Sequence, residues 1–425
     1  MGVGVFLTDT PGIGGRLRAS AQDFVVREVS RPPPRQAGPF TVATVTSTNW
    51  ETNRLVDALA HQLHLSRNAV GFAGTKDKRA VTTQLMSFKA PPERVSAVQL
   101  GDVTIADAYT TSNGLQLGQL VGNEFELVVS EVEFPSAGAL QRELDETTEQ
   151  LRDHDGAPNF FGPQRFGTLR PCTHLVGRRL TEGDVKGAVM TYLTSPAVAE
   201  DTELQHLRDR LRRDEDWSAA LEAFPQPLNF ERAMLSHLVS DPGDFRGALL
   251  RLPRNLLLMF IHAFQSYLFN RILTARLQAS LPLGDPVIGD LVLPADRNGL
   301  PRQRDPVAVT SDNIGPTARQ VKAGRAFVSA PAFGFDTALA QGDPGEVERL
   351  VLEQELVTAK DFHIGSIPRL SSAGVRREIL MPVFPMQCAI DEADHGKVRM
   401  AFRLNRGCYA TTLLREFMKA EVLAY

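Results

Sequence analysis

The chain has 425 residues, of which 43% are hydrophobic and 23% are charged, and its formal net charge is −4. This composition is typical of a soluble globular protein with two or three domains. The sequence contains no run of 18 apolar residues, so no transmembrane helix is predicted. Because the net charge is negative, any nucleic acid has to be bound by a local basic face.

The first 155 residues are predicted to form strands joined by short connections. Alternating apolar and polar residues and β-rich composition predict strands at 23–30, 40–47, 69–74, 84–89, 103–109 and 124–130. A helix is expected over 52–65, with Thr52 as its N-cap, and a polar helix over 136–153. Since the connections are too short for repeated parallel crossovers, the sheet should be mainly antiparallel.

The pattern changes after residue 170 and is helical over most of 181–280. The segment 254–277 is apolar nearly all round, so we expect it to be buried in a layer of helices. A stretch rich in Pro, Gly and Asp follows over 281–345, strand signals resume over 379–404, and an amphipathic helix is expected over 409–423.

This order of β-rich, helical and β-rich segments predicts an α+β fold. A split domain with a mixed, mainly antiparallel sheet, interrupted by a large, largely helical insertion, explains it more simply than three domains in series. The three cysteines, Cys172, Cys388 and Cys408, have the spacing of neither a zinc site nor a disulfide framework. We therefore expect buried or partly buried thiols and a cytoplasmic protein.

The stretch "GFAGTKDKRAVTTQ" (71–84) places Lys76, Asp77, Lys78 and Arg79 in one short turn. An ordinary solvated hairpin turn is one explanation. The other is an acid that stays ionised beside an anionic partner, because neighbouring cations favour the charged form and keep it available as a nucleophile.

The loop "PNFFGPQRFG" (158–167) combines three Phe with two Gly. It is either a loop buried under the helical segment or a platform for a nucleobase. In the second case an aromatic ring stacks on the base, while Asn159, Gln164 and Arg165 supply hydrogen bonds to a base edge or phosphate.

These motifs resemble the signatures of the TruD family of tRNA pseudouridine synthases. The pattern G-x-K-D-x-x-A-x-T-x-Q matches 74–84, N-x-F-G-x-Q-R-F-G matches 159–167, and D-F-x-V-x-E matches 23–28. "QSYLFN" (265–270) and "GCYATTLLRE" (407–416) are similar to later motifs of the family. The two long signatures are specific, whereas "QSYLFN" alone is a weak signal.

The resemblance implies a catalytic domain over 1–168 and 366–425, with an RNA-binding cleft across its sheet, and an inserted TRUD-type domain over 169–365. It also implies an isomerase that detaches uracil from the ribose C1′ of a tRNA uridine at position 13, in the D arm, and rejoins it through C5. No metal or cofactor is implied. A monomer is expected, and no protein partner is implied.

The resemblance also assigns roles to residues. Asp77 corresponds to the catalytic acid, which either attacks C1′ or removes a ribose proton. Phe161 corresponds to the ring that stacks on the flipped uracil, and Asn159 should hydrogen-bond near Asp77 or the base. Arg18 stands where the family has the basic Lys partner of the Asp, which is a departure from its pattern. Lys76, Lys78, Arg79, Gln164 and Arg165 are expected to contact RNA.

Other residues carry weaker expectations. For Glu28 a structural ion pair near the sheet is the favoured interpretation. Arg376 and Arg377 are either RNA contacts or a solvated pair. Cys408, Leu413 and Leu414 are expected in the core, and Arg415 is left undecided.

Three alternatives to this enzyme remain open on the sequence. An RNA-binding protein that lost catalysis is disfavoured by the intact signature around Asp77. A hydrolase is disfavoured because neither signature holds the second acid that general acid–base hydrolysis needs. A synthase acting at another RNA site is the third.

Overall fold

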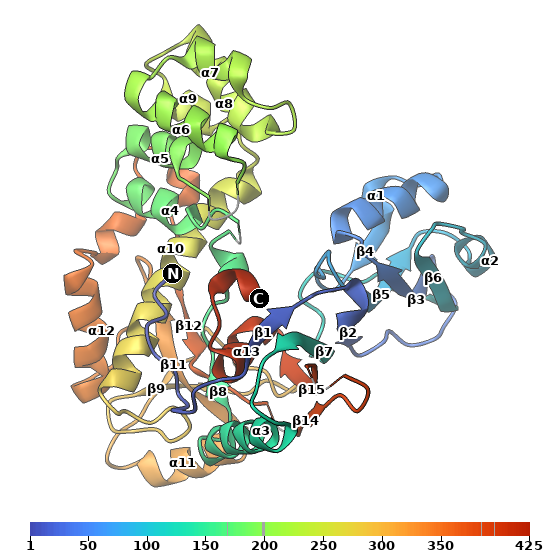
Figure 1. Ribbon diagram of the computed structural model, residues 1–425, viewed down its shortest axis with the longest axis vertical. Coiled ribbons are helices and arrows are strands. Elements are labelled where there is room, and N and C mark those ends of the chain that lie inside the picture. Colours follow the sequence, from blue (N-terminus) through green and yellow to red (C-terminus); the bar gives the residue numbers. More distant parts are fainter. Residues whose placement is uncertain (168, 198–199, 384, 395) are drawn as a thin grey trace. The chain divides into compact units, whose positions relative to one another are not determined.

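The computed structural model describes residues 1–167, 169–197, 200–383, 385–394 and 396–425. The chain forms two compact units. The split unit contains Phe6–Ala157 and Met381–Tyr425, and the inserted unit contains Met1–Val5 and Pro158–Leu380 (Figure 1). The predicted inserted domain, 169–365, falls within the inserted unit, and its bounds stay a prediction. The chain passes between the units between Val5 and Phe6 and in two short strands, β8 (Ala157–Pro158) and β13 (Leu380–Met381).

The split unit is built on one mixed sheet, in the order β14-β15-β7-β2-β5-β3-β6, with β1 paired to β7 and β4 to β5. Its strands are β1 (Gly14–Leu17), β2 (Phe24–Val29), β3 (Phe40–Thr48), β4 (Val70–Phe72), β5 (Val81–Phe88), β6 (Val103–Thr111), β7 (Gly122–Val132), β14 (Met386–Ile390) and β15 (Val398–Asn405). The pairs are antiparallel except for β2 with β5, which run parallel. The predicted α+β class and mainly antiparallel sheet are confirmed.

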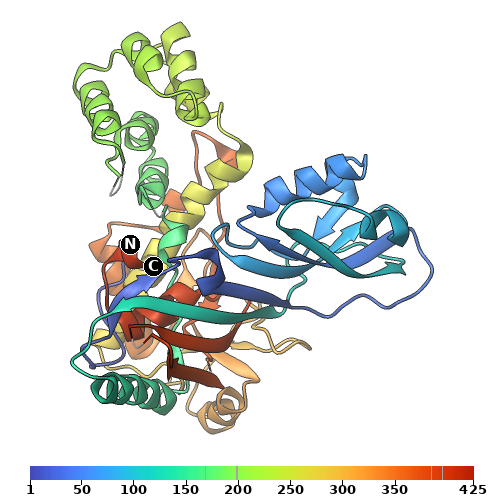
Figure 2. The same ribbon diagram turned by 45° about the vertical axis from the view of Figure 1, so that its right-hand side comes forward.

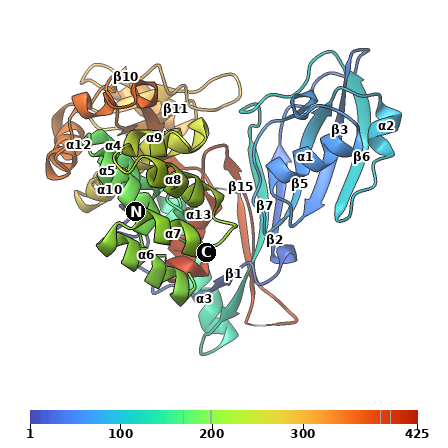
Figure 3. The ribbon, with the colours of Figure 1, turned by 90° about the horizontal axis from the view of Figure 1, so that it is seen from above.

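Four helices pack on this sheet: α1 (Thr52–Gln62), α2 (Pro92–Ser96), α3 (Ala137–Asp153) and α13 (Ala410–Met418). Helix α1 lies over β3 and β5, where its Leu55 and Leu59 share a core with Val45, Met86 and Phe88 (Figure 3). Helices α3 and α13 contribute to a second core with β7 and β15. The buried Leu413 and Leu414 confirm the core expected for the last helix, and Cys408 packs at its edge.

The N-cap of α1 differs from the prediction. Both carboxylate oxygens of Glu51 accept backbone hydrogen bonds, from Asn53 and Arg54, so Glu51 is the N-cap and Thr52 is the first helical residue. A carboxylate at this position also faces the positive end of the helix dipole. The Thr52 hydroxyl is thereby left for another partner, which lies in the signature loop described below.

The inserted unit contains helices and a small antiparallel sheet in the order β10-β9-β11-β12. Its strands are β9 (Leu291–Pro294), β10 (Val307–Ala308), β11 (Ala326–Ala332) and β12 (Val375–Glu378). Its helices are α4 (Thr173–Thr181), α5 (Val185–Thr194), α6 (Thr202–Asp214), α7 (Trp217–Ala223), α8 (Asn229–Ser240), α9 (Phe245–Leu249), α10 (Arg254–Gln278), α11 (Ile314–Lys322) and α12 (Gly342–Gln354). The sequence patterns did not predict α11 and α12, whose first turns contain Gly and Pro; a first turn tolerates Pro because its N–H has no helical partner.

Helix α10 is the central element of the inserted unit and packs along α4 (Figure 2). By length and composition alone it could cross a membrane, but 67% of its most apolar window is buried inside the structure. Phe260, Phe264 and Leu268 are almost fully buried within the core of this unit. This agrees with the burial predicted for 254–277 and explains the apolar composition of the helix as that of a core helix.

Candidate active site

The parallel pairing of β2 with β5 brings two loops of the split unit together. Neighbouring parallel strands begin at the same end of a sheet, and Val25 of β2 lies opposite Val81 of β5. The segment before β2 carries Arg18, and the loop before β5 carries Asp77. Arg18 and Asp77 are 59 positions apart in the sequence, yet both lie at the end of the sheet where β2 and β5 begin.

Asp77 and Arg18 form an ion pair, with 3.3 Å between Oδ1 and Nη2. The Asp77 side chain is 41% exposed, whereas that of Arg18 is 16% exposed, so solvent and ligands reach the carboxylate more readily than the guanidinium. The Arg18 guanidinium also lies 4.1 Å from the ring centroid of Phe24, which is buried. Arg18 adopts a positive φ of 61°, a left-handed conformation that is strained for a side chain of this size. The predicted pairing of Arg18 with Asp77 is present in the geometry.

Lys76, next to Asp77, has an internal partner. Its ammonium lies 2.7 Å from Oε2 of Glu28, and both side chains are at most 2% exposed. The structural ion pair predicted for Glu28 is therefore confirmed. Since the Lys76 charge is buried against Glu28, it is not presented to a phosphate here, and we assign it to holding the loop. The hydroxyl of Thr52 accepts the Lys76 N–H at 2.8 Å, which fixes the same segment from the start of α1.

The two cations after Asp77 are placed differently. Lys78 and Arg79 are both exposed, and within the described part of the chain neither forms an ion pair. On the other side of Lys76, Gly74 is buried, and a Cβ there would lie 3.0 Å from Leu120. The loop thus has a buried side that anchors it and an exposed cationic side.

The second signature loop, 158–167, lies in the inserted unit. Phe160 and Phe166 are buried, whereas Phe161 is half-buried. Phe166 meets the ring of His174 edge-on, with 5.2 Å between centroids, and Phe161 meets Phe269 edge-on at 5.3 Å. Two of the three aromatic rings are therefore core residues, and Phe161 is the one that is partly exposed.

Asn159 is fully buried, and its amide is engaged on both sides. Its Oδ1 accepts from Nη2 of Arg377 at 2.7 Å, and its Nδ2 donates to the carbonyl of Glu378 at 3.1 Å. This arrangement uses Asn159 to join the loop to β12. It supports a role in holding the loop rather than the expected direct contact with a base.

The motif "QSYLFN" on α10 carries residues whose roles the sequence did not reveal. Asn270 accepts the Phe161 N–H at 2.8 Å and donates to the Phe161 carbonyl at 3.1 Å. Ser266 accepts a hydrogen bond from Nε of Arg165 at 3.0 Å, and Gln164, the other predicted RNA-contacting residue of the loop, is partly exposed. The only signal in the sequence was polar residues inside an otherwise apolar helix, where a buried amide needs partners.

The arginines of β12 are not solvated, and that part of the prediction was wrong. Arg376 and Arg377 are 2% and 4% exposed. Arg376 pairs with Glu348 of α12 at 2.7 Å, and the Arg377 guanidinium lies 3.8 Å from the ring centroid of Phe161. Arg415, left undecided, lies over the ring of Phe6 at 3.8 Å, and burial lowers its pKa.

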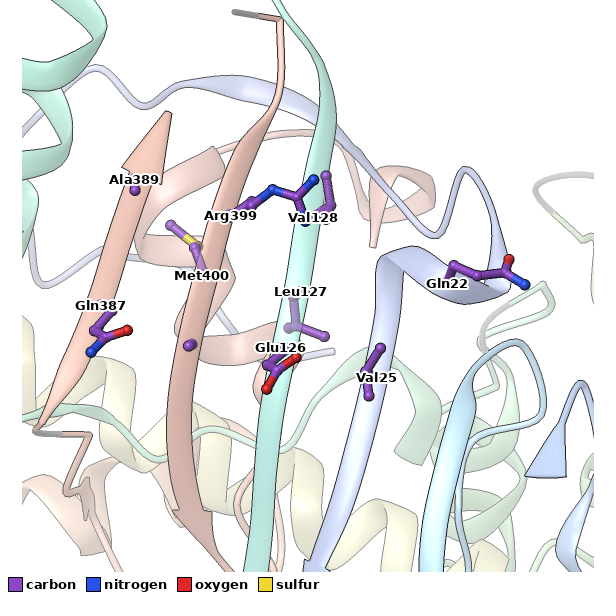
Figure 4. A pocket seen from close by; sticks show the side chains of 10 residues that line it. Gln22, Val25, Glu126, Leu127, Val128, Gln387, Ala389, Arg399 and Met400 are labelled. Atoms are coloured by element: carbon purple, nitrogen blue, oxygen red, sulfur yellow. The ribbon is translucent and has the colours of Figure 1, made fainter. Parts of the chain in front are cut away.

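A groove of about 400 Å³ lies on the face of the sheet formed by β2, β7, β15 and β14 (Figure 4). Its walls combine apolar side chains with Gln22, Glu126, Gln387 and Arg399. Gln22 is four residues after Arg18, so the groove begins close in sequence to the Asp77 partner. Among the described residues, no group of three or more His, Cys, Asp or Glu side chains is placed to hold a metal ion.

The burial of His174 beside this loop predicts a pH-dependent stability. Desolvation, together with the positive N-terminus, lowers the His174 pKa from 6.5 to about 4. The unfolded chain therefore takes up a proton between pH 6.5 and 4 that the folded chain excludes, so stability falls as the pH falls through this window. The loss should reach about 3 kcal/mol by pH 4, at about 1.4 kcal/mol per pKa unit.

Urea unfolding at several pH values, for wild type and His174→Phe, measures this effect. The Phe ring can keep the contacts with Phe166 and Tyr267 but cannot be protonated. We expect the wild type to lose more stability than the variant between pH 6.5 and 4, and equal losses would contradict the prediction.

Comparisons with known proteins identify the family of the whole chain. The family model described as tRNA pseudouridine synthase D (TruD) matches residues 1–417. A relative from Methanococcoides burtonii, named "Probable tRNA pseudouridine synthase D", is 41% identical over all of this chain and 97% of its own length. A relative of the same name from Halobacterium salinarum is 39% identical and matches all of this chain and 98% of its own length.

Structural similarity extends over the whole chain as well. A structure titled "Crystal Structure of the Putative tRNA pseudouridine synthase D (TruD) from Methanosarcina mazei" superimposes with a TM-score of 0.88 and 37% sequence identity, covering 100% of this chain and 98% of that one. The chain belongs to the TruD family of tRNA pseudouridine synthases, isomerases that convert uridine in tRNA to pseudouridine.

Proposed function

We propose that this protein converts the uridine at position 13 of tRNA, in the D arm, to pseudouridine, and that it acts in the cytoplasm as a monomer with Asp77 as its catalytic residue. The observation that carries the assignment of Asp77 is its exposed carboxylate, held by Arg18 in the loop that bears the first signature. An accessible carboxylate can attack the ribose C1′ or remove a ribose proton. Both routes are compatible with this geometry.

Each remaining site residue has a role that its environment supports. The bidentate fork of Arg18 would orient Asp77 more firmly than the point charge of a Lys. The half-buried ring of Phe161 would stack on the flipped uracil, and buried Asn159 would hold the Phe161 loop. Flipping a base out of its stack costs a few kcal/mol, which phosphate contacts by Lys78 and Arg79 would offset, with Gln164 and Arg165 as further RNA contacts.

The proposed activity is tested with purified protein and two tRNA transcripts that differ only in a uridine or a cytidine at position 13. Pseudouridine is then mapped along each transcript in buffer containing EDTA. We expect one new pseudouridine, at position 13, in the first transcript and none in the second. Product at another uridine would contradict the target position, and no product in either transcript would contradict the activity.

Salt titrations of tRNA binding test the exposed cations of the first loop. Each phosphate contact adds roughly 0.7 to 0.9 to the negative slope of log affinity against log salt concentration. Replacing both Lys78 and Arg79 by Ala should therefore weaken binding and lower that slope by about one to two units. The modified uridine should stay the same, because phosphate contacts position RNA without reading its sequence.

The control for this titration is Arg142→Ala, which removes an exposed cation from α3 in the same unit. Its binding slope should equal that of the wild type. If the Lys78→Ala/Arg79→Ala variant also keeps the wild-type slope, these cations face solvent in the complex and the RNA is held elsewhere.

A further inference from the structure

The ring of Phe161 is packed against a buried guanidinium. The Arg377 guanidinium carbon lies 3.8 Å from the Phe161 centroid and 5.1 Å from the centroid of Phe269. Arg165 also lies over this ring, with its guanidinium carbon 5.5 Å from the centroid, so Arg377 makes the closer of the two contacts. Arg377 itself is 4% exposed and therefore belongs to the interior of the inserted unit rather than to its surface.

The main chain of Phe161 is fixed separately. Asn270, which is fully buried in α10, pairs its amide with both the N–H and the carbonyl of Phe161. The same Nδ2 also donates to the carbonyl of Met1 at 3.0 Å. With the backbone held by Asn270, the remaining freedom of Phe161 is the rotation of its side chain, and the group stacked on the ring limits that rotation.

Arg377 reaches the loop by a second route, through Asn159. Its Nη2 donates to Oδ1 of Asn159, whose N–H donates to the carbonyl of Ile379 at 2.8 Å. A planar guanidinium can lie flat on an aromatic ring and donate hydrogen bonds in its own plane at the same time, which an ammonium cannot do. One side chain thus couples the ring of Phe161 to the residue two positions before it.

We propose that Arg377 is a positioning residue for the uracil-stacking ring. Its guanidinium packs on the ring of Phe161, and its hydrogen bond to Asn159 holds the loop that carries this ring. This inference rests on the proposed function, in which Phe161 stacks on the flipped uracil. Because the contact is made in the free enzyme, the ring is oriented before the substrate arrives.

The experiment is a double-mutant cycle on turnover, with Arg377→Ala, Phe161→Leu and the pair of them. Misplacing a binding group by about 1 Å can cost about a hundredfold in rate, so Arg377→Ala should lower kcat by roughly tenfold to a hundredfold. The dissociation constant for tRNA should change less than about twofold, since backbone contacts supply most of the affinity. In the Phe161→Leu background, Arg377→Ala should have almost no further effect on kcat, because the ring that it positions is gone.

Two further variants separate positioning from general stability. Arg377→Lys keeps the positive charge but lacks the planar guanidinium group, so its kcat should lie between those of wild type and Arg377→Ala. This variant replaces Arg377→Ala in the test if the Ala variant does not fold. Arg376→Met removes the neighbouring buried arginine, whose side chain points to the other face of the strand and pairs with Glu348. It should lower the unfolding midpoint while leaving kcat close to wild type at temperatures where it is folded.

The possible results distinguish a failure of the positioning role of Arg377 from a failure of the proposed function. If Phe161→Leu lowers kcat but folded Arg377→Ala and Arg377→Lys both turn over like wild type, the positioning role is overturned while the stacking role of Phe161 stands. Additive effects of Arg377→Ala and Phe161→Leu on kcat would overturn it as well. If wild-type protein forms no pseudouridine in tRNA, the proposed function itself fails.

Discussion

Replacing Asp77 by Asn is expected to abolish pseudouridine formation, with a loss in kcat of at least about 10⁴-fold, as for other groups that act directly in covalent chemistry. The amide has nearly the shape of the carboxylate but can neither attack C1′ nor accept a ribose proton. No other acid lies in the loop from Ala73 to Ala80, so no neighbour can replace it. Stability should change little, because the Asp77 side chain is 41% exposed and solvent screening reduces the contribution of such an ion pair to about 1 kcal/mol.

Turnover of a defined tRNA transcript and the unfolding midpoint should be measured on the same preparations. The matched control is Asp57→Asn, because Asp57 also forms an exposed ion pair with an arginine, Arg67, in the same unit. That variant should keep wild-type turnover. Measurable turnover by folded Asp77→Asn protein, above the level of a mock purification, would remove Asp77 from the catalytic role.

The pairing of Asp77 with Arg18 shows which features of the site the sequence pattern predicts and which it does not. Alternation of apolar residues predicts the strands before and after each loop, because side-chain period is a local property. The alternation does not reveal that β2 and β5 run parallel. This parallel pairing brings the Arg18 segment and the Asp77 loop to the same end of the sheet. Only the family resemblance pointed to that pair beforehand.

Burial of charge was the least predictable feature. Lysine and arginine are usually exposed, so the sequence favours a surface position for Lys76, beside two other cations, and for Arg376, beside Arg377. Their partners lie far along the chain: Glu28 is 48 residues from Lys76, and Asn159 is 218 residues from Arg377. Such pairs depend on tertiary packing, which no local pattern encodes. By contrast, helix 254–277 was predicted almost to the residue, because its apolar length is itself the signal.

Breaking the buried pair of Lys76 and Glu28 should have the largest effect on stability. Removing one partner of a buried ion pair leaves an uncompensated charge and typically costs about 3–5 kcal/mol. Glu28→Met and Lys76→Met should each approach this loss, since both side chains are at most 2% exposed. The double variant should recover most of it, because two apolar side chains leave no charge in the interior. Turnover should follow stability only in part, since Lys76 also fixes the loop that carries Asp77.

Fluorescence of Trp50 reports this unfolding if the other tryptophan, Trp217 of the inserted unit, is replaced by Phe in every variant. Arg27 and Glu126 provide the control cycle, since Arg27 is the neighbour of Glu28 on β2 and its ion pair is about half exposed. That cycle should give a coupling below about 1 kcal/mol. A coupling of Lys76 with Glu28 no larger than this would mean that water reaches the pair in solution. The first loop would then be held by Thr52 and its backbone contacts, and Lys76 would return to the set of cations available to RNA.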